Sequence, residues 1–257
     1  MKKLLLTLSF LSLAQTAALA KQITNPFYMT KEDSFISTSY FEYQKYHLKS
    51  PNTARHYSRA RKIGQNIEYG LSDRASLSVM LSNTWIRQKD DFENTQKENT
   101  NIDWAVGGHY DLYSTENYFL QAKVHYLQKQ THHARGAYKA FDANIRTGYD
   151  LGILLPYIGA WGQLPVAQSS TADDKIKCGA YGGFYTQANF ASLDVSVNYD
   201  YDRLDMSNRL YMRSVLNFLI ADNFALGGYF NYTFIDKGSD SKEADDRTIG
   251  GQILVHF

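Results

Sequence analysis

The sequence predicts an all-β protein: a single up-and-down antiparallel β-barrel of about twelve strands that crosses a membrane. Three observations support this prediction. Apolar and polar residues alternate with a period of two along most of the chain, as in strands whose two faces meet different surroundings. The connections between these stretches are short and long by turns. After residue 20 there is no uncharged apolar stretch of about 20 residues, which excludes helical membrane spans.

The first 20 residues have the three parts of a cleavable export signal. Lys2 and Lys3 form a basic start, residues 4–13 are almost entirely apolar, and the small residues Ala18 and Ala20 suit a signal peptidase. The apolar part is too short for the roughly 20 residues of a spanning helix. We therefore predict a signal peptide at 1–20 and cleavage after Ala20.

Twelve stretches have the pattern of strands. The clearest is 193–202, where Val195 and Val197 alternate with polar residues; a helix would scatter those polar residues around its surface. Each stretch is near the 9–11 residues that a tilted spanning strand needs, and ten or fourteen strands are the alternatives to twelve. The facing of the glycine-rich stretch 154–164 stays open. The predicted strands are 35–44, 62–69, 76–85, 102–112, 118–127, 141–149, 154–164, 176–187, 193–202, 210–220, 224–234 and 251–257.

The connections sort themselves by position in the chain. Five tight joints lie at 72–74, 114–117, 150–152, 188–191 and 221–223. Between them come polar and mostly longer connections at 48–56, 88–100, 129–137, 165–175, 203–208 and 236–246. A membrane barrel with both termini on one side needs this alternation of tight turns inside and longer loops outside. A soluble sandwich has no reason to sort its connections in this way.

The two faces of the predicted strands differ in charge. The apolar faces carry no Asp, Glu, Lys or Arg, while Lys62, Lys123 and Arg146 all lie on polar faces. A Lys or Arg in contact with lipid at the bilayer midplane costs about 2–4 kcal/mol. The apolar faces are therefore expected to face lipid, and the polar faces to face the interior of the barrel.

The last strand carries a family resemblance. Ile253, Val255 and the terminal Phe257 share one strand face, opposite Gln252 and His256. An alternating strand that ends in an aromatic carboxy-terminus resembles the closing strand of bacterial outer-membrane β-barrels of the porin-like superfamily. The resemblance implies that 21–257 is the barrel, with a short periplasmic segment at 21–33, in the outer membrane of a Gram-negative bacterium. It also implies that Ile253, Val255 and Phe257 serve as the assembly signal.

Function has to be sought on the inward faces. Eight-stranded barrels are filled by side chains, whereas 16-stranded porins enclose an aqueous channel. A twelve-stranded barrel lies between them, so the lumen is either a narrow pore or a blocked core. The predicted pore-lining residues are Glu42, Lys62, Glu68, Asp103, His109, Asp111, Lys123, His125, Asp142, Arg146, Asp194, Asn198, Asp200 and Arg213.

A porin-like passive channel for small polar solutes is the function that we expect. On the inward faces seven acidic positions outnumber four basic ones, which favours cations slightly. The alternative is a non-conducting barrel that acts as a structural protein, adhesin or receptor, in which the inward charges pair with one another. If the first hairpin is symmetric, Glu42 lies opposite Lys62.

A lipid-hydrolysing enzyme is a further alternative. His56 and Ser58 lie near the outer rim and are two residues apart, so in an extended strand they share a face. The pair is similar to the His-x-Ser of barrel enzymes that cleave lipids or deacylate lipid A, in which His activates the Ser nucleophile. The following residues do not continue the phospholipase pattern, and no third, orienting acid can be assigned. We therefore expect no enzyme.

The remaining partners follow from composition. Without Lys2 and Lys3 the chain has 25 basic and 26 acidic residues, which is no basic footprint for nucleic acid. Cys178 is the only cysteine, so no internal disulfide can form. We expect neither cofactor nor metal. The expected partners are outer-membrane lipid and lipopolysaccharide, the barrel-assembly machinery through the last strand, and small polar solutes if the lumen is open.

Overall fold

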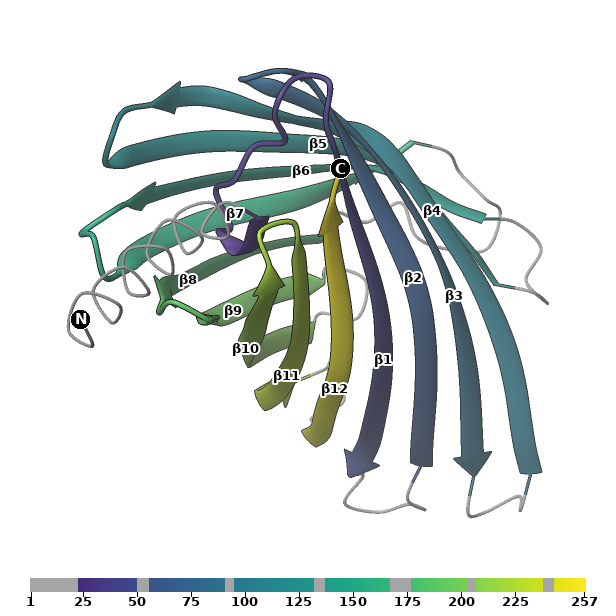
Figure 1. Ribbon diagram of the computed structural model, residues 1–257. Coiled ribbons are helices and arrows are strands. Elements are labelled where there is room, and N and C mark those ends of the chain that lie inside the picture. The colour runs from purple at the N-terminus through teal and green to yellow at the C-terminus, as the bar shows by residue number, and fades with distance from the viewer. Residues whose placement is uncertain are drawn as a thin grey trace.

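The computed structural model describes residues 23–49, 56–90, 95–131, 137–166, 177–202, 207–237 and 243–257. Within these ranges the chain forms a closed antiparallel barrel of twelve strands, in which neighbours in the chain are neighbours in the sheet and β1 pairs with β12 (Figure 1). This confirms the predicted fold class and strand number. The strands are β1 (Phe35–Lys49), β2 (His56–Ser72), β3 (Ala75–Asp90), β4 (Thr95–Ser114), β5 (Tyr118–Thr131), β6 (Ala137–Tyr149), β7 (Leu155–Pro165), β8 (Lys177–Gln187), β9 (Ala191–Asp202), β10 (Ser207–Ala221), β11 (Phe224–Lys237) and β12 (Glu243–His256).

The strands are longer than predicted. They range from 11 residues in β7 to 20 residues in β4. Much of the extra length lies at the end of the long connections, where residues 95–100, predicted as loop, pair with β3 from Asp90↔Thr95 to Trp85↔Thr100. The prediction missed them because backbone hydrogen bonds can continue into water, where neither face of a strand has to be apolar.

The tight turns are confirmed, and they lie at one end of the barrel. They span residues 73–74, 115–117, 150–154, 188–190 and 222–223. The barrel closes at the same end, where the backbone N–H of Phe35 donates to the Phe257 carbonyl at 3.1 Å and the Phe35 carbonyl accepts from the Phe257 N–H at 2.9 Å. The register also places Glu42 opposite Lys62, as the symmetric hairpin predicts. In the orientation that the turn lengths indicate, this is the periplasmic end.

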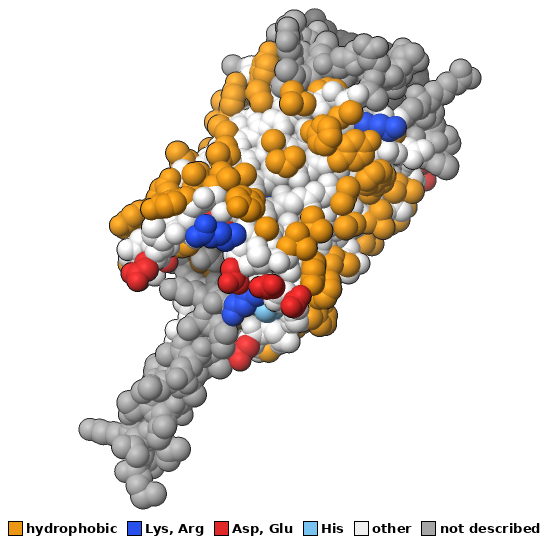
Figure 2. Space-filling view, turned by 90° about the horizontal axis from the view of Figure 1, so that it is seen from above, with side chains coloured by type: hydrophobic (Ala, Val, Ile, Leu, Met, Phe, Trp, Pro, Cys, Tyr) orange, Lys and Arg blue, Asp and Glu red, His pale blue; other side chains and the backbone are white. Residues whose placement is uncertain are grey.

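The outer wall of the barrel is apolar. Each strand keeps large apolar side chains exposed on one face; the exposed fractions are 57% for Leu81 and 48% for Val197. Polar residues at the alternate positions, such as Ser82 and Ser196, are buried. Figure 2 shows hydrophobic side chains spread over the wall, with the charged ones near its ends. A closed barrel has only an inside and an outside, so the apolar face meets lipid.

The structure also settles the facing of the strand at 154–164. In β7 the side chains of Ile158 and Leu164 are exposed on the outer wall, while Leu155 and Tyr157 are buried inside. Among the described residues, no helix is long and apolar enough to cross a membrane.

Residues 23–34 precede β1 and are called the N-terminal segment below. They begin with a short helical turn and continue without regular structure to Ser34. In Figure 1 the segment lies within the ring of strands at the end where the carboxy-terminus also lies. Ile23, Phe27 and Thr30 are buried there, with at most 7% of each residue exposed.

Candidate functional site

The N-terminal segment fills part of the lumen with apolar side chains. Phe27 packs in a buried cluster with Leu155, Tyr157 and Tyr185, and its ring is stacked on Phe119 with the ring centroids 5.5 Å apart. These residues come from β5, β7 and β8. A second cluster joins Ile23 to Ala225 and Leu254, on β11 and β12. The segment therefore bridges opposite sides of the barrel.

Hydrogen bonds attach the N-terminal segment to the inner wall of the barrel. Gln121 Nε2 donates to the carbonyl oxygen of Phe27 at 2.7 Å, and Thr30 Oγ1 donates to Glu68 Oε1 at 2.8 Å. The hydroxyl groups of Thr24 and Tyr185 lie 2.8 Å apart. Gln121 and Thr30 are almost completely buried, so loss of either partner leaves a polar group without water or protein to bond, a cost of about 1–3 kcal/mol.

Two glycines of the wall make room for the segment. A Cβ atom at Gly70 would stand 1.8 Å from the carbonyl oxygen of Lys31, and one at Gly148 would stand 2.7 Å from the Phe27 ring. At Gly70 the backbones touch directly: Asp33 N donates to Gly70 O at 3.1 Å, and Glu32 forms a parallel bridge with Gly70. Any larger residue at position 70 would push the segment away from the wall.

A cluster of charged side chains from the strands lies next to the N-terminal segment, deeper in the lumen. Arg146 donates through Nη2 to Gln121 Oε1 at 2.9 Å, and its guanidinium lies over the Phe27 ring, 4.9 Å from the centroid. His109 Nε2 is 3.0 Å from the same Gln121 oxygen, and His109 Nδ1 is 3.6 Å from Glu68 Oε1. Gln121 thus links the segment to a cation and an imidazole, while Glu68 links it to the other side of the cluster. Lys123 faces Glu68 and Arg146 in the same layer.

The aromatic side chains of the lumen lie against its wall. A Cβ atom at Gly64 would stand 2.3 Å from the ring of Tyr40, and one at Gly250 would stand 2.1 Å from the ring of Tyr229. Each ring therefore covers a glycine of the neighbouring strand. At these two places the ring occupies the space that a side chain at the glycine would fill.

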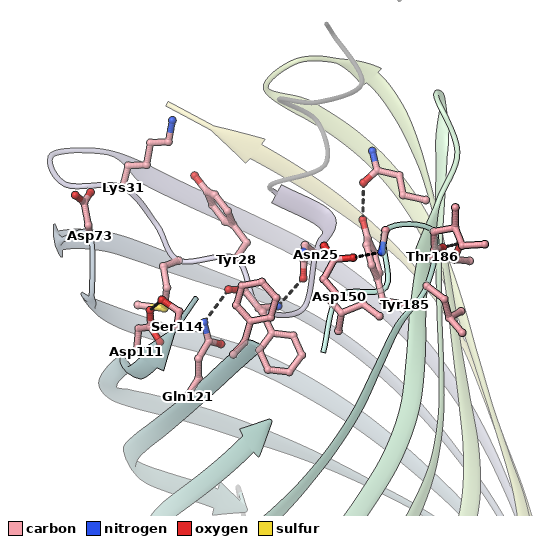
Figure 3. A pocket seen from close by; sticks show the side chains of 18 residues that line it. Asn25, Tyr28, Lys31, Asp73, Asp111, Ser114, Gln121, Asp150, Tyr185 and Thr186 are labelled. Atoms are coloured by element: carbon pink, nitrogen blue, oxygen red, sulfur yellow. Dashed lines mark hydrogen bonds between the residues drawn. The ribbon is translucent and has the colours of Figure 1, made fainter. Parts of the chain in front are cut away.

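A cavity of about 430 Å³ opens at the mouth, between the N-terminal segment and the tight turns. Figure 3 shows Asn25 and Tyr28 of the segment beside Gln121, whose amide points to the backbone of the segment. Tyr28 lies partly buried, and this burial raises the pKa of its hydroxyl. The segment is thus in contact with the periplasm on one side and with the charged lumen on the other.

The chain resembles solved bacterial outer-membrane barrels in fold. The chain is similar to an outer membrane channel from Pseudomonas putida F1, with 10% identity, a TM-score of 0.66, and coverage of 91% of this chain and 98% of that one. It is also similar to the translocator domain of the autotransporter NalP from Neisseria meningitidis, with 9% identity, a TM-score of 0.62, and coverage of 97% and 96%.

The NanC porin aligns with a TM-score of 0.52 and 7% identity, over 84% of this chain and 98% of that one. No protein-family model and no curated protein matches the sequence. The fold is that of a twelve-stranded bacterial outer-membrane β-barrel. At these identities the likeness concerns the fold alone.

The structure places every predicted pore-lining residue on the inward face of the barrel. This follows from the strand pairing and from the alternation of burial along each strand. Near the periplasmic end lie Glu68, His109, Asp111, Lys123, Arg146 and Asp194; farther toward the long connections lie Glu42, Lys62, Asp103, His125, Asp142, Asn198, Asp200 and Arg213. That they line a conducting passage stays a prediction.

The predicted excess of inward acidic residues is wrong. Lys129, Lys177 and Arg209 also face inward, so the described inward positions hold seven basic and seven acidic residues. Lys177 lies over the ring of Tyr138, and Lys129 faces Asp103. Lys129 was missed because it falls in a stretch that the sequence assigns to a loop. Among the described inward positions, the count of charges therefore gives no preference for cations.

The N-terminal segment itself was not predicted as part of the site. Its sequence, with Phe27 and Tyr28 after Pro26, has no strand or helix period. The signal that could have found it is the pair of aromatic residues, because large rings in a short exposed segment would lie in water. The boundaries 21–33 of the periplasmic segment, and the signal peptide at 1–20, stay predictions, because residues 1–22 lie outside the described ranges.

The structure describes the backbone of the candidate catalytic pair but not its side chains. His56 and Ser58 belong to β2, but their side chains are outside the described part of the structure. Within the described residues, no group of three or more His, Cys, Asp or Glu side chains is arranged to hold a metal ion. At the assembly signal, Ile253 and Phe257 are exposed on the outer wall and Val255 shares their strand face.

Proposed function

We propose that this outer-membrane barrel is a channel for small polar solutes and that its N-terminal segment controls the periplasmic end. The observation that carries the proposal is that Phe27 packs against the inner wall and Thr30 bonds to Glu68, inside a lumen lined by charges of both signs. The segment is attached to the inner wall by two small apolar clusters, by side-chain hydrogen bonds and by backbone contact at Gly70. It is not itself one of the twelve strands, which suits a removable closure.

The first test is to remove the closure. A refolded barrel that lacks residues 23–32 is expected to give steady ohmic steps in planar lipid bilayers, because β1 begins only at Phe35 and the sheet stays intact. The complete mature barrel is expected to show rare openings or much smaller steps. Heat-modifiable migration in gels checks that both proteins are folded.

The outcomes separate the competing functions. Equal conductance of the two proteins would show that the segment is no gate. If neither protein conducts, the channel is wrong and a non-conducting structural, adhesin or receptor barrel becomes the better explanation. Both results are read from the same bilayer recordings.

We further propose that the chain is not an enzyme. Replacement of Ser58 by Ala is expected to leave phospholipase and lipid A deacylase activities of the purified barrel at the same background as the unchanged protein. The physical reason is that a Ser nucleophile depends on a base and an orienting group, and the residues after Ser58 do not continue the phospholipase pattern. A measurable activity that disappears in the Ser58→Ala variant would overturn this.

The membrane context adds partners to this proposal. The apolar wall contacts outer-membrane lipid, with lipopolysaccharide on the side of the long connections. We propose that the barrel-assembly machinery binds the exposed side chains of Ile253 in β12 and of the aromatic Phe257 that follows it. The reason is that β12 is the strand that closes on β1.

A further inference from the structure

The outer wall carries a row of cations at the end of the long connections. Along successive strands the register places Arg247 of β12 opposite Lys45 of β1, Lys45 opposite Arg59 of β2, and Arg59 opposite Arg87 of β3. All four side chains are exposed and share the face of the lipid-contacting residues. Arg61 stands two residues from Arg59 on the same face. These five residues are called the basic row below.

Such a row is costly unless something neutralises it. Like charges directly opposite each other on neighbouring strands are destabilising. Glu98 of β4 lies opposite Arg87 and accepts hydrogen bonds from it, with distances of 2.6 and 2.8 Å. Among the side chains described in this patch, Glu98 is the one carboxylate beside Lys45, Arg59, Arg61 and Arg87, while the guanidinium of Arg247 lies over the Tyr232 ring, 5.5 Å from its centroid. Lys45, Arg59 and Arg61 therefore concentrate positive charge on one patch of the outer wall, which favours an anion from outside the barrel.

The depth of the basic row identifies where that anion lies. Arg61, the innermost of the five, lies in line with Ile249, Tyr43 and Trp85. Nearer the membrane, Phe41, Ile63 and Ile102 are exposed. Tyr and Trp mark the interface between the apolar core and the headgroups. The basic row therefore stands at the headgroup level of the outer leaflet, which is the side of the long connections.

A cavity of about 200 Å³ lies within this patch, lined by Tyr43, Arg59, Arg61, Trp85, Arg87 and Glu98 among others. At about 30 Å³ per water molecule in the liquid, it has room for a phosphate group and part of its hydration shell. Arg side chains match phosphate oxygens with paired N–H donors, and such charge-assisted bonds are about twice as strong as neutral ones. Trp85 and Tyr43 would cover the sugar or the upper acyl chain next to the phosphate.

We propose that the basic row and this cavity form a binding site for a phosphate group of lipopolysaccharide, the glycolipid of the outer leaflet. Arg59 and Arg61 provide the guanidinium groups that bind it, while Lys45, Arg247 and Arg87 add positive potential. The site depends on the outer-membrane placement of the barrel and not on conduction, so a barrel that fails to conduct still tests it.

The test is native mass spectrometry of the refolded barrel in detergent, with phosphorylated lipid A added in increasing amounts. The double variant Arg59→Gln with Arg61→Gln is expected to bind lipid A about tenfold more weakly, since it loses both charge-assisted forks. Lys139→Gln is the matched control: Lys139 is a cation on the same outward face, near the same end of β6, away from the patch. It is expected to bind as the unchanged barrel does.

Three further ligands test whether the site recognises the phosphate of lipid A in particular. Lipid A from which the phosphates have been removed is expected to bind the unchanged barrel as weakly as phosphorylated lipid A binds the double variant. Phosphatidylglycerol and inorganic phosphate are expected to bind more weakly than lipid A. Equal binding of dephosphorylated lipid A, of phosphatidylglycerol or of inorganic phosphate would each overturn the site, as would an equal loss in Lys139→Gln.

Folding is controlled separately. Heat-modifiable migration has to be retained in every variant that is compared. If the double Gln variant does not fold, Arg59→Lys with Arg61→Lys keeps the charges and removes the forks, and it is expected to weaken lipid A binding severalfold. Unchanged binding in that folded variant would contradict the bidentate recognition proposed for the two arginines.

Discussion

Replacement of Val197 by Arg is expected to prevent assembly of the barrel. Val197 lies in the middle of β9, with 48% of its surface exposed on the outer wall. An Arg on the lipid face near the bilayer midplane costs about 2–4 kcal/mol, a large share of the 5–15 kcal/mol that stabilises a typical protein. The barrel has no other orientation in which this side chain could leave the lipid.

The neighbouring position supplies the control. Asn198 faces the lumen, where its amide bonds to Ser196, and Asn198→Arg is expected to assemble because its charge meets the polar interior. The measurement is the fraction of heat-modifiable barrel in outer-membrane preparations, with refolding into lipid vesicles as a second readout. Equal assembly of the two variants would show that the facing of β9 is wrong.

Replacement of Gly70 by Ala is expected to open the channel without removing any residue. The added Cβ would lie 1.8 Å from the carbonyl oxygen of Lys31 and 2.6 Å from that of Thr30. These are backbone atoms that cannot rotate away, so the segment has to move. Overpacking of this kind costs about 1–3 kcal/mol, which shifts an equilibrium between seated and released segment by roughly 5–150-fold.

Open probability in planar bilayers measures this shift. Gly228→Ala is the matched control, because its Cβ would stand 3.6 Å from Gly250 O, an ordinary contact. Gly70→Ala is expected to raise the open probability toward that of the barrel without residues 23–32, and Gly228→Ala to leave it unchanged. An unchanged open probability in Gly70→Ala, despite conduction by the deletion variant, would mean that contact with Gly70 does not hold the segment.

The inward face could be predicted from the sequence because each strand has only two faces. Once charge is excluded from the lipid side, positions such as Asp142, Arg146 and Arg213 have to face inward. The same argument failed where polar residues occupy both faces. Lys129 and Lys177 belong to paired strands that extend beyond the apolar belt, and no alternation marks them there. The balance of inward charge therefore came out wrong.

The contacts between the N-terminal segment and the wall could not be predicted from the local sequence pattern. Alternation and turn spacing are local, and they suffice to establish the strands, their order and which face meets lipid, because the membrane imposes the same requirement on every strand. The seat of Phe27 against Tyr157 and the approach of Lys31 to Gly70 join residues that are far apart in the chain.

The basic row on the outer wall also depends on register. Arg247, Lys45, Arg59 and Arg87 look like scattered charges near loops in the sequence, and only the pairing of four strands puts them side by side. Long-range packing and register decide such contacts, because they depend on how the whole sheet closes and not on the period of any one strand.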